Sequence, residues 1–158
     1  MYEIKLKVNG EERTALVKAD MNLLEVLRDQ FHLTAAKCGC NCGDCGACSV
    51  IADGKLIKSC ITNAMTCDGM EIETLEGLAK GPGRLSILQD AFHQNCASQC
   101  GFCTPGMIMA SLALLREDPD PSEEKIKEAL AGNLCRCTGY VNIIKAVRQA
   151  AALMKEEK

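Results

Sequence analysis

Residues 39–50 read GCNCGDCGACSV and place four cysteines and three glycines in one short stretch. Three of these cysteines, Cys40, Cys45 and Cys48, combine with the more distant Cys60 in the spacing C-x4-C-x2-C-x11-C. A loop that wraps a metal centre must aim backbone N–H groups at it, and this requires small residues that can adopt positive φ. The glycines supply this freedom, so the stretch predicts a metal-binding loop around which the rest of a small domain is built.

The same spacing is typical of plant-type ferredoxins, in which C-x4-C-x2-C is followed by a distant fourth ligand. We therefore predict a 2Fe–2S cluster held by Cys40, Cys45, Cys48 and Cys60. A 4Fe–4S cluster and zinc remain open. The triplet from Cys42 through Cys45 to Cys48 fits the start of a bacterial 4Fe–4S motif, but Ala52 stands where that motif continues with cysteine. We interpret Cys38 and Cys42 as small loop residues without a ligand role.

A second cysteine set lies further along the chain, as Cys100-x2-Cys103 and Cys135-x-Cys137. A thioredoxin-like redox pair would need a strand before the C-x2-C, and the pattern predicts none there. Zinc ligand pairs usually stand two to four residues apart, which disfavours zinc at the C-x-C without excluding it. The C-x-C pair suits two ligands on one iron of a small cluster. We therefore favour an iron–sulfur cluster at this set as well.

The composition sets limits on the class of protein. The chain has 158 residues, 25% of them charged, and a net charge of −3, which gives no electrostatic reason to expect nucleic acid or a membrane surface as partner. It has no apolar run of about 18 residues, and the N-terminus lacks the apolar core of a signal peptide. We therefore expect a cytoplasmic protein. In a reducing compartment, 12 clustered cysteines favour metal binding or redox chemistry over disulfides.

The N-terminal half has the pattern of short strands around one helix. Asn9-Gly10 and Asp53-Gly54 are strong hairpin signals between alternating segments. Asn22 can cap a helix that ends near Phe31. The predicted elements are strands at 2–8, 12–18, 49–53, 55–59 and 70–75, and helices at 22–31 and 61–66. This pattern predicts an α+β domain of the β-grasp type, like a plant-type ferredoxin, over residues 1–76.

The C-terminal half has the helical period instead. Residues 77–83, GLAKGPG, contain three glycines and a proline and predict a linker. Leu85, Leu88, Ala91 and Phe92 lie on one face of a first helix. Further helices are predicted from Thr104-Pro105, over 122–131, and from about Asn142. Four helices with short connections predict a four-helix bundle as a second domain, over residues 84–158.

Long motifs at both cysteine sets resemble a known family. QCGFCTPGMIM (99–109) and GNLCRCTGY (132–140) are similar to the signature segments of the iron–sulfur subunits of the molybdenum hydroxylases, the xanthine dehydrogenase and aldehyde oxidoreductase family. GCNCGDCGACSV with Cys60 resembles the family's other cluster loop. The resemblance covers nearly the whole chain. Residues 129–147 look most like the small subunit of 4-hydroxybenzoyl-CoA reductase.

This resemblance implies an electron-transfer subunit of an oxidoreductase, without a substrate site or catalytic residue of its own. The family's roles place Cys40, Cys45, Cys48 and Cys60 around a 2Fe–2S cluster near FAD. They place Cys100, Cys103, Cys135 and Cys137 around a second 2Fe–2S cluster near molybdenum. Gln99 matches the residue that hydrogen-bonds the pterin, and Cys137 the ligand nearest to it. Gln99 could alternatively be a polar residue that fixes the cluster loop.

The implied partners are a large molybdopterin-binding subunit and a medium FAD-binding subunit, assembled as a dimer of heterotrimers. A chain that contains only this module suggests a separate subunit, whereas some relatives fuse the parts. A free-standing ferredoxin-like carrier and a zinc-stabilised interaction module are the alternatives from other classes. His32 and His93 have no matching acid and nucleophile, so we assign neither a catalytic role.

Overall fold

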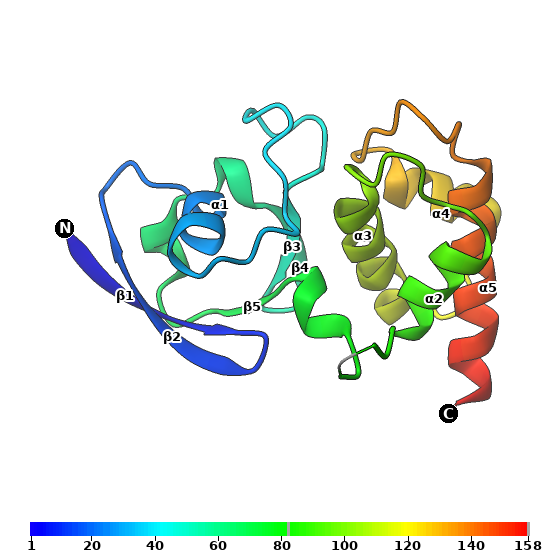
Figure 1. The fold of residues 1–158 in the computed structure, drawn as a ribbon, viewed down its shortest axis with the longest axis horizontal. Coiled ribbons are helices and arrows are strands. Elements are labelled where there is room, and N and C mark those ends of the chain that lie inside the picture. The colour runs from blue at the N-terminus through cyan, green and yellow to red at the C-terminus, as the bar shows by residue number, and fades with distance from the viewer. Residues whose placement is uncertain (82, 158) are drawn as a thin grey trace.

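The computed structural model describes residues 1–81 and 83–157, and it confirms the predicted α+β architecture. A five-stranded sheet with one short helix forms the N-terminal half, and four helices form the C-terminal half (Figure 1). Pro82, in the predicted linker, and Lys158 lie outside the described residues. Within those residues no helix is long and apolar enough to cross a membrane.

The sheet has the strand order β2-β1-β5-β3-β4. β1 and β5 pair in parallel, and the other neighbours pair antiparallel. Both hairpins turn where the sequence predicts, since Asn9, Gly10, Asp53 and Gly54 all have positive φ. The strands are β1 (Tyr2–Val8), β2 (Glu11–Val17), β3 (Ser49–Ala52), β4 (Lys55–Lys58) and β5 (Glu71–Glu73).

The helix that packs on this sheet is shorter and less regular than predicted. Asn22 caps it in a capping box with Glu25, but α1 (Leu23–Glu25) continues as a π-helical turn over Val26–Gln30. The predicted helix at 61–66 is also wrong. Two 3₁₀ turns, Ser59–Ile61 and Ala64–Cys67, stand there instead, because Asn63 is extended between them and caps the second through the backbone N–H of Met65.

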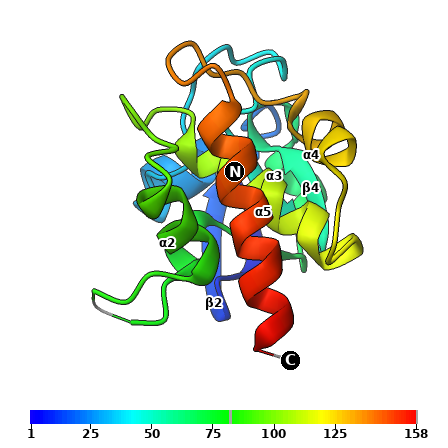
Figure 2. The ribbon, with the colours of Figure 1, turned by 90° about the vertical axis from the view of Figure 1, so that its right-hand side faces the viewer.

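The C-terminal half packs three helices around a central one. α3 (Thr104–Glu117) is buried along most of its length, and α2, α4 and α5 surround its outer side (Figures 1 and 2). Leu85, predicted on the buried face of the first helix, is 48% exposed, because Ser86 caps that helix and Ile87 begins it. A further 3₁₀ turn, Leu75–Leu78, leads into this half. The other helices are α2 (Ile87–Gln94), α4 (Glu123–Leu130) and α5 (Val141–Glu156).

The two halves meet where α3 lies against β3. All four residues of β3 are buried, and successive side chains of a strand point to opposite faces. Ile51 therefore joins the core of the helical half, while Val50 and Ala52 join the core beneath the sheet. At the end of α3, Arg116 donates two hydrogen bonds of 2.7 Å to the carboxylate of Glu73 in β5. This bidentate pair holds the pKa of Glu73 below its usual value, so both groups are charged at neutral pH.

We expect this ion pair to couple the two halves by about 1 kcal/mol, since both side chains are partly exposed to solvent. A double-mutant cycle of Arg116→Met and Glu73→Gln, followed by thermal unfolding without oxygen, measures the coupling. The exposed pair of Lys7 and Glu71, within the sheet alone, is the matched control and should couple far less. Equal coupling in the two cycles would contradict a role at the junction.

Candidate iron–sulfur sites

The first cysteine loop leads into β3 and curls its backbone around one sulfur. The N–H groups of Cys42 and Cys45 donate to Cys40 Sγ over 3.4 and 3.3 Å. These two hydrogen bonds lower the pKa of Cys40 to about 6. Cys60 comes from the 3₁₀ turn after β4, where it is buried against the Cys48 thiol; burial and then this contact raise its pKa to about 12. The structure thus places the distant fourth thiol of the predicted set, that of Cys60, against the thiol of Cys48.

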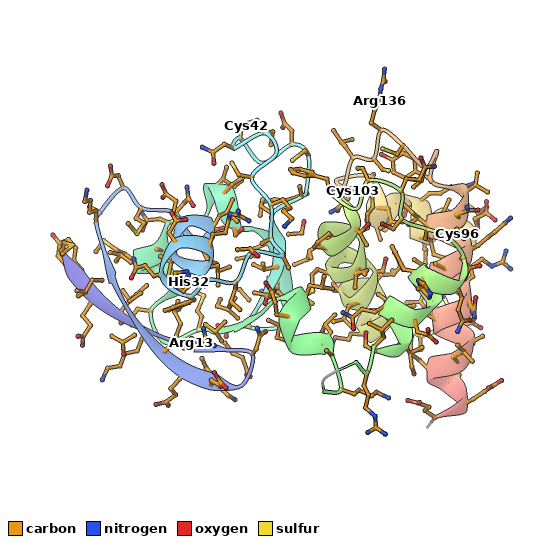
Figure 3. The ribbon with its side chains drawn as sticks, in the orientation of Figure 1. Arg13, His32, Cys42, Cys96, Cys103 and Arg136 are labelled. Carbon is orange, nitrogen blue, oxygen red and sulfur yellow. The ribbon has the colours of Figure 1, made fainter. Side chains whose placement is uncertain are left out.

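Cys42 is exposed and lies at the outer end of this loop (Figure 3). Its Sγ donates to the Asp44 carboxylate over 3.3 Å, and this contact raises the pKa of Cys42 to about 11. The Cys42 thiol is therefore engaged by a carboxylate outside the predicted ligand set. Of the other thiols without a predicted ligand role, Cys38 and Cys96 are exposed and Cys67 is buried.

The second set joins the segment before α3 to the segment before α5. Cys137 Sγ lies 3.6 Å from Cys100 Sγ. The Cys103 thiol contacts that of Cys135, and burial followed by this contact raises the pKa of Cys103 to about 12. Each thiol of the C-x-C pair therefore approaches a thiol of the other segment, whereas the sequence suggested that this pair would share one iron. The side chain of Arg136, the residue between them in sequence, points outward into solvent (Figure 3).

Tyr140 closes the second cysteine segment on itself. Its backbone is left-handed, with φ +68°, and turns the side chain back over residues 133–135. The phenolic oxygen accepts the N–H of Cys135 over 2.9 Å and donates to the carbonyl oxygen of Asn133 over 3.2 Å. Thr138 contacts Cys135 Sγ through its hydroxyl and its N–H. Burial alone would raise the pKa of Cys135, but hydrogen bonds from Thr138, Cys137 and Cys103 together outweigh it and lower that pKa.

The two cysteine segments also touch each other, which sequence reasoning did not foresee. The N–H of Leu134 donates to the carbonyl oxygen of Cys45 over 2.8 Å. The amide of Asn133, only 2% exposed, donates to Gly46 O over 3.0 Å and to Ser49 Oγ over 3.3 Å. Lys58 adds a hydrogen bond to the carbonyl oxygen of Gly132. The sequence signal for this contact was a polar residue, Asn133, two residues before the predicted ligand Cys135.

Gln99 lies at the outer end of the second set. Gln99, Cys100 and Cys137 are all exposed, whereas Cys103 and Cys135 are half-buried. The set therefore has one thiol pair at the surface and one pair toward the protein interior. A group in a neighbouring protein could approach the outer pair without passing through this chain.

The residues of both sets fit an iron–sulfur cluster. All 12 cysteines are free of disulfides, and backbone N–H groups point at sulfur, as thiolate ligands require. The 3.6 Å separation of Cys100 and Cys137 is close to that of two thiolates on one tetrahedral metal, about 3.8 Å for bonds of ~2.3 Å. Two sets of this kind, one on each half of the fold, define a protein with two iron–sulfur centres.

Comparison with known proteins supports this class. The 2Fe-2S iron-sulfur cluster binding domain family matches residues 6–79, and the 2Fe-2S binding domain family matches residues 74–148. The chain is 48% identical to the nicotinate dehydrogenase small FeS subunit of Eubacterium barkeri over 93% of both chains. It is 46% identical to a probable xanthine dehydrogenase subunit from Bacillus subtilis, over 91% of this chain and 82% of the relative.

A solved structure agrees with these relatives. The aldehyde oxidoreductase from Desulfovibrio gigas superposes with a TM-score of 0.94 and 42% identity, over all of this chain and 18% of the larger protein. This chain is therefore an iron–sulfur protein with two 2Fe–2S domains. More specifically, it belongs to the iron–sulfur subunits of the molybdenum hydroxylase family, and it serves an oxidoreductase in electron transfer.

The contact between the cysteine segments predicts an unequal cost for two similar substitutions. Gly46 has φ +73°, and an added Cβ would lie 2.6 Å from Asn133 Nδ2. Gly54 has φ +78° with open space around it. Gly54→Ala should therefore cost only the backbone strain, ~1–2 kcal/mol, while Gly46→Ala adds ~1–3 kcal/mol of overpacking.

The Tm and the iron content of both variants, purified without oxygen, provide the test. We expect Gly46→Ala to lower the Tm well below that of Gly54→Ala and to lose iron. Equal Tm values and full iron in both variants would contradict the observed contact.

Proposed function

We propose that each thiol set is the complete ligand set of one 2Fe–2S cluster. The donor chemistry supports this, since each set offers four thiols, one of them with a lowered pKa, from two segments of the chain. When bound, such a cluster accepts and releases one electron at a time. The proposed ligands are Cys40, Cys45, Cys48 and Cys60 for the first cluster, and Cys100, Cys103, Cys135 and Cys137 for the second.

We propose that the chain carries single electrons between a molybdopterin centre and FAD, each held by a partner subunit. The observation that carries this proposal is the hydrogen bond from the Leu134 N–H to the Cys45 carbonyl oxygen. Leu134 precedes Cys135, so a single hydrogen bond connects a proposed ligand of one cluster to the backbone beside a ligand of the other. The chain's contribution is to hold the two ligand sets at a fixed short separation.

We propose that the second thiol set faces the molybdenum subunit, and the exposure of its outer end supports this placement. Gln99 and Cys137, at the exposed end of the second set, would meet the pterin of the molybdenum subunit. The first loop would lie nearer the FAD.

We further propose that the chain assembles with a large molybdopterin subunit and a medium FAD subunit, as a dimer of heterotrimers in the cytoplasm. The specific likeness to 4-hydroxybenzoyl-CoA reductase stays a prediction, because substrate is selected in the large subunit.

We also propose the division into residues 1–76, a linker at 77–83 and residues 84–158. The two matched families meet at residues 74–79, which supports a boundary there. Leu75–Leu78 form a 3₁₀ turn at this point and lead from the sheet to α2.

The ligand assignment predicts opposite results for two neighbouring cysteines. Cys45→Ser should lose the first cluster and keep the second, leaving two of four irons per chain. Cys42→Ser should keep four, because its thiol binds Asp44. Iron analysis and electron paramagnetic resonance (EPR) after oxygen-free purification measure both. Loss of two irons in Cys42→Ser would show that the first ligand set is misassigned.

The partner assignment is tested by native, oxygen-free purification through this subunit, with metal and flavin analysis. We expect molybdenum, FAD and two larger chains, with four irons per copy of this subunit. Iron on a solitary chain would indicate a free-standing carrier and would overturn the proposed partners.

A further inference from the structure

Thr138 lies beside one sulfur of the second set and contacts it twice. Its Oγ1 is 3.1 Å from Cys135 Sγ, and its backbone N–H donates to the same sulfur over 3.4 Å. Thr138 stands only three residues after Cys135 in the chain. Both contacts therefore arise from the local turn and not from a distant element.

The direction of the hydroxyl hydrogen bond follows from its other partner. The N–H of Tyr140 donates to Thr138 Oγ1 over 3.2 Å, so this oxygen already acts as an acceptor. A thiolate ligand has no proton to give. The Thr138 O–H therefore donates to Cys135 Sγ. Tyr140 in turn accepts the Cys135 N–H at its phenolic oxygen, so the threonine and the sulfur are held in one closed network.

A nearby threonine makes a different contact. Thr104 directly follows Cys103, another proposed ligand, but its hydroxyl hydrogen-bonds Ser98 Oγ over 3.0 Å. Among the hydroxyl groups of the described residues beside this set, that of Thr138 is directed at a sulfur and that of Thr104 is directed at another hydroxyl. The two threonines thus differ in whether the hydroxyl group donates a hydrogen bond to a thiolate, and only such a bond stabilises negative charge on the sulfur.

We propose that Thr138 is a positioning residue that acts through Cys135 to raise the reduction potential of the second cluster. This inference rests on the proposed ligand role of Cys135. Reduction adds one electron, and so one negative charge, to the four thiolates and the group they hold. A donated hydrogen bond stabilises the more negative state more strongly, and hydrogen bonds to the sulfurs are among the factors that set such potentials. Removal of the hydroxyl should therefore make reduction harder.

Thr138→Val removes the O–H and keeps the branched shape, and Thr104→Val is the matched control. Both are made in the complete complex, and a redox titration followed by EPR gives the midpoint potential of each cluster. Cys45→Ser, which keeps only the second cluster, identifies its signal. We expect Thr138→Val to disfavour reduction of the second cluster by about tenfold, or ~59 mV for one electron. The first cluster and both clusters of Thr104→Val should keep their wild-type potentials.

Thr138→Ser retains the hydroxyl and should restore most of the potential, which a merely structural role of the side chain would not predict. Thr138→Ala should lower the potential of the second cluster as Thr138→Val does. It provides the same test if the valine methyl group disturbs the loop. An unchanged potential in either variant with four irons per chain would overturn the inference and leave the ligand assignment standing. Four irons retained in Cys135→Ser would instead overturn the ligand assignment on which it rests.

Discussion

The contact between the two cysteine segments is the constraint on which the rest of this structure depends. The buried Asn133 amide reaches across to Gly46 and Ser49, and the backbone of Leu134 bonds directly to that of Cys45. The two backbones can come this close only because Gly46 has no side chain. Gly106 is needed for the same reason, because a Cβ there would overlap the carbonyl oxygen of Gly46. A buried amide without these partners would cost about 1–3 kcal/mol, so the contact also fixes the register of the two halves.

This contact explains why a small electron-transfer module needs a helical half. The sheet half alone supplies one thiol set, from the loop between the π-helical turn and β3 and from the 3₁₀ turn after β4. α3 packs on β3 and presents Cys103 at its N-terminal end, so the second set rests on the first through a buried surface. The ion pair of Arg116 and Glu73 closes the far end of the same surface. The helical half therefore holds the second thiol set against the first, with Cys100 and Cys137 exposed at the surface.

The parts that follow from local sequence were predictable. The hairpins at Asn9-Gly10 and Asp53-Gly54, the helices of the second half and both cysteine sets have signals within a few neighbouring residues. The π-helical turn, the exposure of Leu85 and the role of Asn63 between two 3₁₀ turns were not predicted, because capping and tertiary contacts override periodicity there. The pairing of thiols across segments and the burial of Asn133 depend on contacts between residues far apart in the chain, which periodicity does not report.

The most direct test of this account is the EPR spectrum of the oxygen-free, reduced subunit in its native complex, with spins and irons counted per chain. The account predicts two distinguishable signals, each integrating to one spin per chain, with four irons in all. A single signal with two irons, or a colourless protein that holds zinc, would contradict the assignment of two 2Fe–2S clusters to the two thiol sets.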